Sequence, residues 1–412
     1  MKPQKKIVVL LGIIILGYIV YGIYSYIVRC ILKMDYPNGT FLFNSVDQYM
    51  DFFNVNFMVH EWNSYIEYYS SYPPLALLLA YPFSLMADYA SYEYPPLDIV
   101  YTLPAKISFG LFVGIFTLLI VWLVNLYLKR AKVIKNPWIR WIVSIGLTIT
   151  APYLFMVDRG NYLIITIILM LAFIYFYEDH EYVSAIFLGL AIALKIYPMF
   201  LFLLLFIDKR WKSMGLATIV GGGVTVLTFP LFHGGIWQNI REFGAALLAF
   251  GGGYVEEYSN VYFCTGLTSL LRMPFMIWND CKIPETFPLM KIYVFGGTAL
   301  VLWSVWNLKK EQRFWKKILI LLCLMVFLTP SSYMYNLMYF LPATLLLLVA
   351  DDGGSKKTDT CYLVLMGLIL IPKAYYYFIP EHFVGIQTIL DSCLLLSMIL
   401  FYNIADKETR RC

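Results

Sequence analysis

Charged residues are scarce in this chain. Asp, Glu, Lys and Arg make up 14% of its 412 residues, whereas hydrophobic residues make up 60% and the mean hydropathy is +0.70. A soluble domain needs polar and charged side chains to cover its surface, so this composition excludes one. Apolar runs of about 20 residues recur instead, and each can cross a bilayer as a helix. We therefore predict an all-α polytopic membrane protein, with residues 1–412 forming a single integral membrane domain.

Histidine and cysteine are too few for the common metal sites. The chain has four histidines and seven cysteines, and it has no Cys-x-x-Cys pair. We therefore expect no metal site and no cofactor. Cys264 and Cys281 fall in one predicted outer loop, where a disulfide and two separate thiols are the alternatives. A basic segment interleaved with aromatic residues is also lacking, which argues against a nucleic-acid partner.

Aromatic residues, by contrast, are abundant, with 34 tyrosines, 30 phenylalanines and 10 tryptophans. Such rings suit both the interfacial belts of membrane proteins, where they contact lipids, and pockets for amphipathic ligands. At the N-terminus, Lys2, Lys5 and Lys6 precede an apolar run over residues 7–28 that no small-residue cleavage site follows. We interpret this run as an uncleaved first span.

The positions of Lys and Arg predict the side on which each loop lies, because cytoplasmic loops are enriched in these residues. Basic residues gather at both ends of the chain and in three internal stretches. We therefore place both termini on the cytoplasmic side of a plasma membrane, with two long segments, 30–103 and 231–288, outside. The predicted bundle has about 10–12 transmembrane helices. Its simple spans cover residues 7–28, 104–128, 141–157, 162–177, 213–230, 289–308 and 318–333, a return crossing that ends by about residue 350, and then 361–378 and 383–403.

Two apolar segments do not fit a simple crossing. Residues 75–86 lie between two Pro-Pro pairs in the first outer segment, so we interpret them as a re-entrant or interfacial helix. Residues 183–207 are too short for two crossings, yet the basic residues that follow belong inside. Two short helices broken near Pro198, entering and leaving on one side, satisfy both conditions. A single full helix with the basic cluster outside is the alternative.

Asp47 and Asp51 are the first candidates for chemistry. They stand four residues apart in the first outer segment, so they share one face if this segment is helical. A carboxylate among aromatic residues at the outer edge of the membrane can have a raised pKa and act as a general base. The alternative is a pair of solvated loop carboxylates.

Two cationic residues are further candidates. In the segment Asp158-Arg159-Gly160-Asn161, the glycine permits a tight turn and the arginine can bind a phosphate through two hydrogen bonds. The alternative there is a helix cap beside an interfacial arginine. Lys195 interrupts an apolar run, where a charge is costly and usually functional, with snorkelling to the interface as the alternative.

The segment 329–336 places small and polar residues inside an apolar stretch. It reads Thr-Pro-Ser-Ser-Tyr-Met-Tyr-Asn and includes Ser332 and Tyr335. Irregular backbone at membrane depth should line a cavity and not face lipid. The alternative is a kinked helix whose hydroxyl groups bond to its own backbone.

These segments together resemble the GT-C superfamily of membrane glycosyltransferases, and most closely glycosyltransferase family 87. The resemblance covers about residues 50–340 and consists of an ordered set of short motifs. Along the chain these are Asp51-Phe52, Tyr72-Pro73-Pro74-Leu75, Arg159-Gly160-Asn161, Gly189-Leu190-Ala191 with Lys195-Ile196-Tyr197-Pro198, and Thr329-Pro330-Ser331-Ser332-Tyr333.

The resemblance implies transfer of a sugar, such as mannose, from a polyprenyl-phosphate donor to a lipid or glycan acceptor on the outer face. In such enzymes an aspartate of the first outer loop, which corresponds to Asp51 here, deprotonates the acceptor hydroxyl, and the anomeric configuration is inverted. Arg159 and Lys195 match positions where the family carries polar residues that face the donor phosphate. We expect the other substrate contacts from Asp47, Asn161, Tyr197, Ser332 and Tyr335.

One departure from the family concerns the last motif. Related proteins often carry a histidine just after the Ser-Tyr pair, whereas Met334, Tyr335 and Asn336 follow it here. Tyr335 can donate a hydrogen bond, but it is a poor base near neutral pH. A transporter or flippase of lipid-linked saccharides and a polysaccharide polymerase are the alternative functions. We predict a membrane glycosyltransferase that needs no metal.

Overall fold

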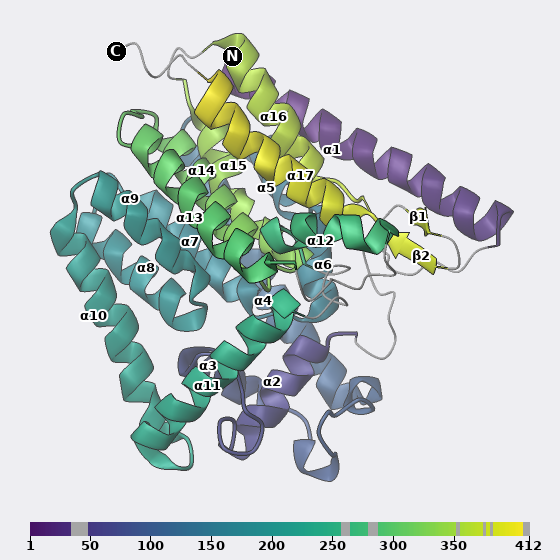
Figure 1. Cartoon of the computed structure of the whole chain (residues 1–412), viewed down its shortest axis with the longest axis vertical. Coiled ribbons are helices and arrows are strands. Elements are labelled where there is room, and N and C mark those ends of the chain that lie inside the picture. The colour runs from purple at the N-terminus through teal and green to yellow at the C-terminus, as the bar shows by residue number, and fades with distance from the viewer. Residues whose placement is uncertain are drawn as a thin grey trace.

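The computed structural model of the chain describes residues 1–33, 48–256, 264–278, 287–351, 355–373, 376–379 and 382–406. Helices dominate these residues, which confirms the predicted all-α fold (Figure 1). The first half of the chain contains α1 (Pro3–Tyr26), α2 (Met50–His60), α3 (Pro74–Ser84), α4 (Leu103–Arg130), α5 (Pro137–Thr148), α6 (Ala151–Arg159), α7 (Leu163–Phe176), α8 (Glu181–Leu194) and α9 (Phe202–Ile207).

The second half is also mainly helical. It contains α10 (Trp211–Thr228), α11 (Gly235–Glu256), α12 (Leu267–Trp278), α13 (Leu289–Leu308), α14 (Phe314–Leu328), α15 (Phe340–Val349), α16 (Lys356–Leu370) and α17 (Gln387–Leu400). Two short 3-10 helices matter for the site, η4 (Tyr197–Leu201) and η7 (Met334–Tyr339). The strands β1 (Tyr376–Ile379) and β2 (His382–Gly385) form an antiparallel hairpin.

The lengths of the apolar helices identify an integral membrane protein. Within the described ranges, five helical segments are long and apolar enough to cross a membrane, and they contain α1, α4, α10, α13 and α17. The bent pair α5–α6 makes a sixth if it is one span. Five further apolar segments have only 10–17 residues. The predicted number of spans was higher than the number of full-length helices, because several predicted spans are short helices that pack inside the bundle.

Three predicted spans differ from the structure at proline residues or at the hairpin. The predicted span 141–157 bends by 63° between α5 and α6, where Pro152 in the first turn of α6 cannot continue the preceding helix. The predicted span 361–378 ends at Leu370, shortly before Pro372, and β1 begins at Tyr376. The predicted span 383–403 begins in β2, so its helix starts only at Gln387.

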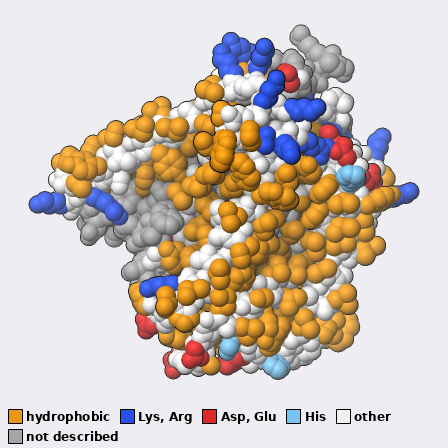
Figure 2. Space-filling view, turned by 180° about the vertical axis from the view of Figure 1, so that it is seen from behind, with side chains coloured by type: hydrophobic (Ala, Val, Ile, Leu, Met, Phe, Trp, Pro, Cys, Tyr) orange, Lys and Arg blue, Asp and Glu red, His pale blue; other side chains and the backbone are white. Residues whose placement is uncertain are grey.

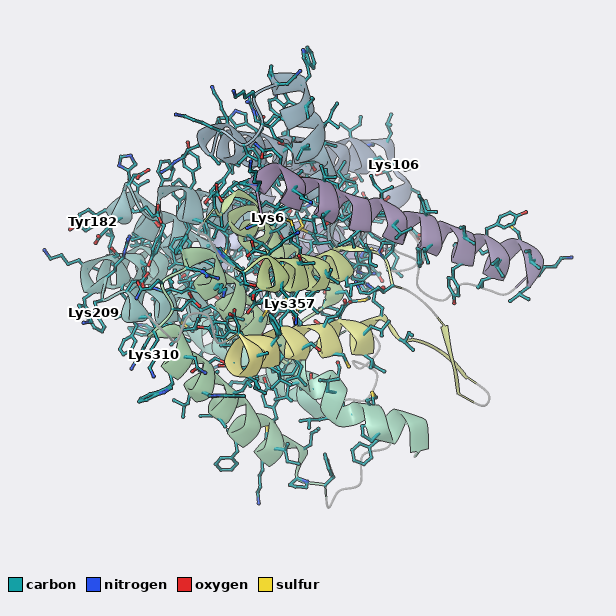
Figure 3. All side chains as sticks on the ribbon, turned by 90° about the horizontal axis from the view of Figure 1, so that it is seen from above. Lys6, Lys106, Tyr182, Lys209, Lys310 and Lys357 are labelled. Carbon is teal, nitrogen blue, oxygen red and sulfur yellow. The ribbon has the colours of Figure 1, made fainter. Side chains whose placement is uncertain are left out.

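The two ends of the molecule differ in charge. Lys and Arg side chains gather, with some Asp and Glu, at the end where the N-terminus lies, whereas Lys and Arg are sparse at the opposite rim, and a broad hydrophobic band lies between the two (Figure 2). We call the first the basic end. Viewed from there, Lys209 and Lys310 lie at the periphery (Figure 3). We call the other the site end, and α2, α3 and α11 lie there (Figure 1).

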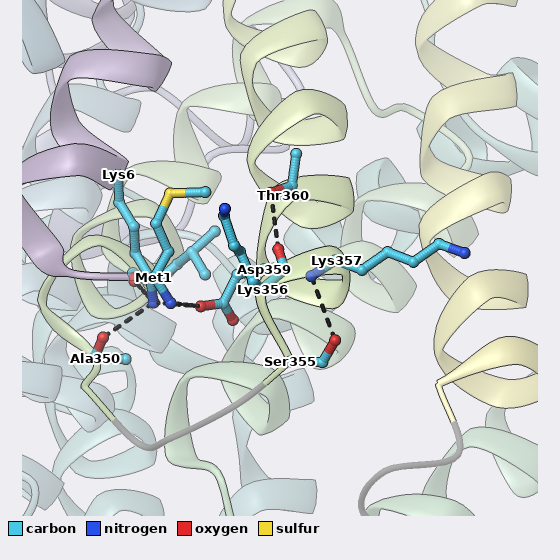
Figure 4. Close-up of polar contacts among 9 residues, drawn as sticks. Met1, Lys6, Ala350, Ser355, Lys356, Lys357, Asp359 and Thr360 are labelled. Atoms are coloured by element: carbon cyan, nitrogen blue, oxygen red, sulfur yellow. Dashed lines mark hydrogen bonds and ion pairs between the residues drawn. The ribbon is translucent and has the colours of Figure 1, made fainter.

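Close helix packing fixes the bundle. α8 and α10 pack closely at Gly189, where a Cβ atom would lie 2.7 Å from the Ala217 carbonyl oxygen. α1 packs on α16, where a Cβ atom on Gly367 would lie 2.6 Å from the Ile13 side chain. The ammonium group of Lys6 is buried there, 3.1 Å from the Asp359 carboxylate and 2.9 Å from the Ala350 carbonyl oxygen (Figure 4). These contacts join α1 to α16 and to the residue that follows α15.

The segment α8–η4–α9 enters and leaves the bundle on one side. Tyr177, just before α8, donates a hydrogen bond of 2.7 Å to Asp208, just after α9, and Lys317 pairs with Asp208 at 2.6 Å. Both ends of the segment therefore lie at the basic end, as predicted for two short helices. The break falls at Lys195 and Ile196, just before Pro198. Lys195 is consequently at the tip of this hairpin.

Candidate functional site

The helix α2 positions Asp51. Phe52, Phe53 and Val55 on its apolar face are completely buried, and the ring of Phe52 lies 5.0 Å from that of Phe112 on α4. This packing fixes the helix against α4. Asp51 lies in the first turn of α2, where the helix dipole favours a negative charge, and it is half-buried.

The Arg159-Gly160-Asn161 turn joins α6 to α7 beneath α2. Gly160 has φ +67°, and the amide groups of Gly160 and Asn161 donate to the carbonyl oxygens of Val157 and Met156. This is the hydrogen-bond pattern of a helix that ends at a left-handed glycine. A Cβ atom on Gly160 would lie 2.7 Å from the Cβ atom of Phe52. The glycine therefore permits both the turn and the close approach of α2.

Asn161 connects this turn to Asp51. Its Nδ2 group donates a hydrogen bond of 2.6 Å to Oδ2 of Asp51, and its Oδ1 atom accepts one of 2.9 Å from the backbone amide of Leu163. Asn161 is 1% exposed. Because both ends of the amide group are bonded, the carboxylate of Asp51 is held in a fixed orientation.

Lys195 faces the same region from the tip of the α8–α9 hairpin. Its Nζ atom lies 5.8 Å from the ring centroid of Tyr72 and 5.5 Å from that of Tyr335. The charge of Asp51 acts on Lys195, Tyr72 and Tyr335 alike. The site thus combines a carboxylate, an ammonium group and two tyrosine rings, contributed by four segments that are distant in sequence.

Tyr72 lies in the loop before α3, next to this carboxylate. Burial raises the pKa of Tyr72 well above its usual value of 10, and the negative charge of Asp51 raises it further. The phenol group therefore stays protonated at physiological pH and remains able to donate a hydrogen bond.

The segment 329–336 forms another side of the site. Tyr197 and Ser331 share a hydrogen bond of 2.8 Å between their hydroxyl groups, which joins η4 to this motif. The ring of Tyr335 stacks on Phe155 of α6 at 6.1 Å. Ser332 is buried, and its carbonyl oxygen accepts a hydrogen bond of 2.6 Å from the amide of Thr265. Ser332 thus holds the neighbouring chain segment in place.

The predicted residues differ in how directly the structure relates them. Asp51, Asn161, Lys195 and Tyr335 come together, and Tyr197 lies beside them. Arg159 is half-buried at the end of α6, two residues from Asn161. Asp47 and Cys281 lie outside the described residues, so their predicted roles have no structural counterpart here. Cys264 is buried and forms a backbone bridge with Tyr333.

Two residues of the site were missed as candidates from the sequence. Tyr72 and Ser331 were noted only as parts of longer motifs, Tyr72-Pro73-Pro74 and Thr329-Pro330-Ser331. The sequence feature that could have identified Tyr72 is the proline pair after it. These prolines begin α3 and so fix the position of Tyr72 at the end of the preceding loop. No group of three or more His, Cys, Asp or Glu side chains suited to a metal ion occurs in the part of the chain that the structure describes.

The bundle and its polar site define an integral membrane protein in which a carboxylate and an ammonium group belong to one site. Glycosyltransferase family 87 matches this chain over residues 69–331, which is more than half of its length. The chain therefore belongs to glycosyltransferase family 87 and is a membrane glycosyltransferase. Tyr72, Arg159, Asn161, Lys195 and Tyr197 lie within the matched region, and Asp51 precedes it. No curated protein matches the chain.

Proposed function

We propose that the protein transfers a hexose, such as mannose, from a polyprenyl-phosphate donor to an acceptor hydroxyl at the outer membrane face. The arrangement of Asp51, Asn161 and Lys195 carries this proposal. An oriented carboxylate next to an ammonium group meets the two needs of the reaction, which are a base for the acceptor and a cation for the leaving phosphate.

In the proposed step, Asp51 takes the proton of the acceptor hydroxyl, and the acceptor oxygen attacks the anomeric carbon of the donor. A bond from that carbon to the acceptor oxygen forms as the bond to the phosphate oxygen breaks. The electron pair leaves with polyprenyl phosphate. Attack from the face opposite the leaving group inverts the anomeric configuration.

Lys195 is the proposed partner of the departing phosphate. The negative charge that develops there is stabilised by a positive group fixed in position before the reaction. We propose Tyr335, Tyr197 and Arg159 as further hydrogen-bond donors to this phosphate. Because side chains supply the positive charge, we propose that no metal is required and that transfer continues in the presence of EDTA.

The charge asymmetry supports an orientation for the protein. Lysine and arginine gather at the basic end, and cytoplasmic loops are enriched in these residues. We propose that the basic end, with both termini, faces the cytoplasm. The site end then faces the outer side of the plasma membrane, where lipid-linked sugars are available without a nucleotide donor.

The test is transfer by the purified protein in nanodiscs, with defined polyprenyl-phosphate sugars and a panel of glycan and glycolipid acceptors. Asp51→Asn should abolish transfer and leave donor binding intact. Asp98→Asn is the matched control, because Asp98 is an exposed carboxylate at the same end. Full activity of Asp51→Asn would refute Asp51 as the base. Transport of the intact donor without transfer would refute the enzyme.

A further inference from the structure

A cavity of about 720 Å³ lies at the basic end. It is bounded by the final turns of α4, α7 and α15 and by the segment that leads into α14. The volume is in the range of small-molecule binding pockets. Asp51 and Lys195 are absent from its lining, which includes Arg130, Glu178, Glu311, Arg313, Leu346 and Val349.

The cavity lies at the end of a helix that can span the membrane. α4 is long and apolar enough to span the membrane, and it ends at Arg130. The cavity is therefore at the level where the hydrocarbon layer meets water. Its wall is aliphatic at Leu346 and Val349, whereas charged side chains border it on other sides. A ligand with an apolar part and a charged part fits both surfaces.

The charged residues of the lining have both signs. Arg130 donates a hydrogen bond of 2.6 Å to the Tyr175 carbonyl oxygen and pairs with Asp179. Both partners of this pair are solvent-exposed, with side chains 40% and 52% accessible, so little free energy is lost if Arg130 contacts another anion. Arginine binds phosphate groups through two parallel hydrogen bonds. Arg130 and Arg313 therefore suit an anionic phosphate.

Glu311, unlike the two arginines, requires a hydrogen-bond donor from a ligand. It is 1% exposed, and its Oε1 atom accepts a hydrogen bond of 2.9 Å from the Arg313 backbone amide. The other oxygen, Oε2, is buried and has no hydrogen-bond partner among the residues that the structure describes. Burial raises the pKa of Glu311, although Lys316 and Arg313 oppose this effect. Lys316 itself is paired with Asp406. A buried carboxylate oxygen without a donor favours a ligand that supplies N–H groups.

We propose that this cavity binds the head group of a lipid that carries a phosphate and a primary ammonium group. The phosphate contacts Arg130 and Arg313, and the ammonium group donates to Oε2 of Glu311. A quaternary ammonium group has the same charge but no N–H donor, so it leaves Oε2 without a partner. A purely anionic head group places a negative charge beside Glu311 and Glu178.

The test compares lipids that remain bound to the purified protein, measured by native mass spectrometry. The protein is first placed in nanodiscs of equal parts phosphatidylethanolamine and phosphatidylcholine with matched chains. We expect the retained ethanolamine lipid to exceed the choline lipid by about tenfold, as one charge-assisted hydrogen bond predicts. Glu311→Gln should reduce the ratio to that of the bilayer. Arg130→Gln should instead reduce the retained amount of both lipids, because both carry the phosphate. Glu93→Gln, an exposed change at the site end, should leave the ratio and the retained amount unchanged.

Several results would overturn the proposal. Equal retention of the two lipids by the wild type would do so, as would a preference that survives in Glu311→Gln or an undiminished amount of bound lipid in Arg130→Gln. Stronger retention of phosphatidylglycerol would show that charge alone is recognised. Soluble phosphoethanolamine can also be added to the protein in pure phosphatidylcholine nanodiscs. If it raises the melting temperature as much as phosphatidylethanolamine does, the ligand of the cavity is a soluble molecule and not a lipid. If the buried Glu311→Gln variant does not fold, the amount of lipid retained by Arg130→Gln decides, because the Arg130 side chain is partly exposed and its replacement should not prevent folding.

Discussion

Asn161 and Asp51 are 110 residues apart in sequence, yet the amide of one donates a hydrogen bond of 2.6 Å to the carboxylate of the other. The turn after α6 therefore orients the proposed base on α2. Asn161 is positioned by Gly160, which permits the turn before it. Asp51 is positioned by Phe52, the buried aromatic residue that follows it. The predictions that follow test this relationship and its surroundings.

Asn161→Ala should lower kcat by about tenfold to a hundredfold, because the carboxylate loses its fixed orientation and the Leu163 amide loses its acceptor. Asn161→Asp should place two carboxylates within hydrogen-bond distance, so the pKa of one rises. Transfer by this variant should be weak at neutral pH and increase as the pH is raised. Rate measurements from pH 5 to 9 would check this, and an unchanged profile would contradict the contact.

Gly160→Ala should both destabilise the protein and reduce activity. The residue has φ +67°, and its new Cβ atom would lie 2.7 Å from the Cβ atom of Phe52. The combined strain should cost about 1–3 kcal/mol. Gly222→Ala is the control, because no atom lies within 4 Å of the Cβ position there. Thermal unfolding in nanodiscs would compare the two variants, and equal melting temperatures would contradict the close approach of α2.

Lys195→Met should reduce kcat by roughly a hundredfold, because a positive group near the leaving phosphate is lost. Lys195→Arg should recover part of the rate, since the charge is kept in a different shape. Lys106→Met, at an exposed lysine of the site end labelled in Figure 3, should change the rate by less than about twofold. Single-turnover rates with a saturating donor would distinguish these outcomes. A fully active Lys195→Met would remove Lys195 from the mechanism.

Tyr72→Phe should lower kcat/KM by about fivefold to tenfold, the usual effect of one lost hydrogen bond. The raised pKa of Tyr72 means that its phenol group is still protonated at pH 10, where an ordinary tyrosine is half ionised. The wild type and Tyr72→Phe should therefore show parallel rate profiles up to about pH 10. An alkaline loss of activity seen only in the wild type would show that Tyr72 titrates in this range.

The fold could be predicted well wherever apolar length and proline position decide the structure. The predicted span 289–308 coincides with α13, and α1 and α4 lie within a few residues of their predictions. The bend at 149–150 was missed because hydropathy is continuous across it, and only Pro152 marks it. The β-hairpin was missed because its strands, Tyr-Tyr-Phe-Ile and His-Phe-Val-Gly, are mostly apolar and aromatic, so hydropathy does not distinguish them from the ends of transmembrane helices.

The site could be predicted only in part. Asp51, Asn161 and Lys195 were found because a charged or amide residue in an apolar setting is unusual in itself. Which of them touch depends on how α2 packs on the α6–α7 turn, and pairwise contacts over such a distance leave no local signal. Tyr72 illustrates this limit, because one tyrosine among 34 has no distinguishing feature until its neighbours are known.

The hairpin α8–η4–α9 has a consequence for how such enzymes can diversify. Its base is anchored at the basic end by the Lys317–Asp208 pair, and its tip presents Lys195. The proposed donor cation is thus built on the membrane bundle, whereas Asp51 lies on α2, which packs against α3. Under the proposed function, changes in α2, α3 and the loop that joins them can therefore alter the choice of acceptor while the residues proposed to bind the donor stay the same.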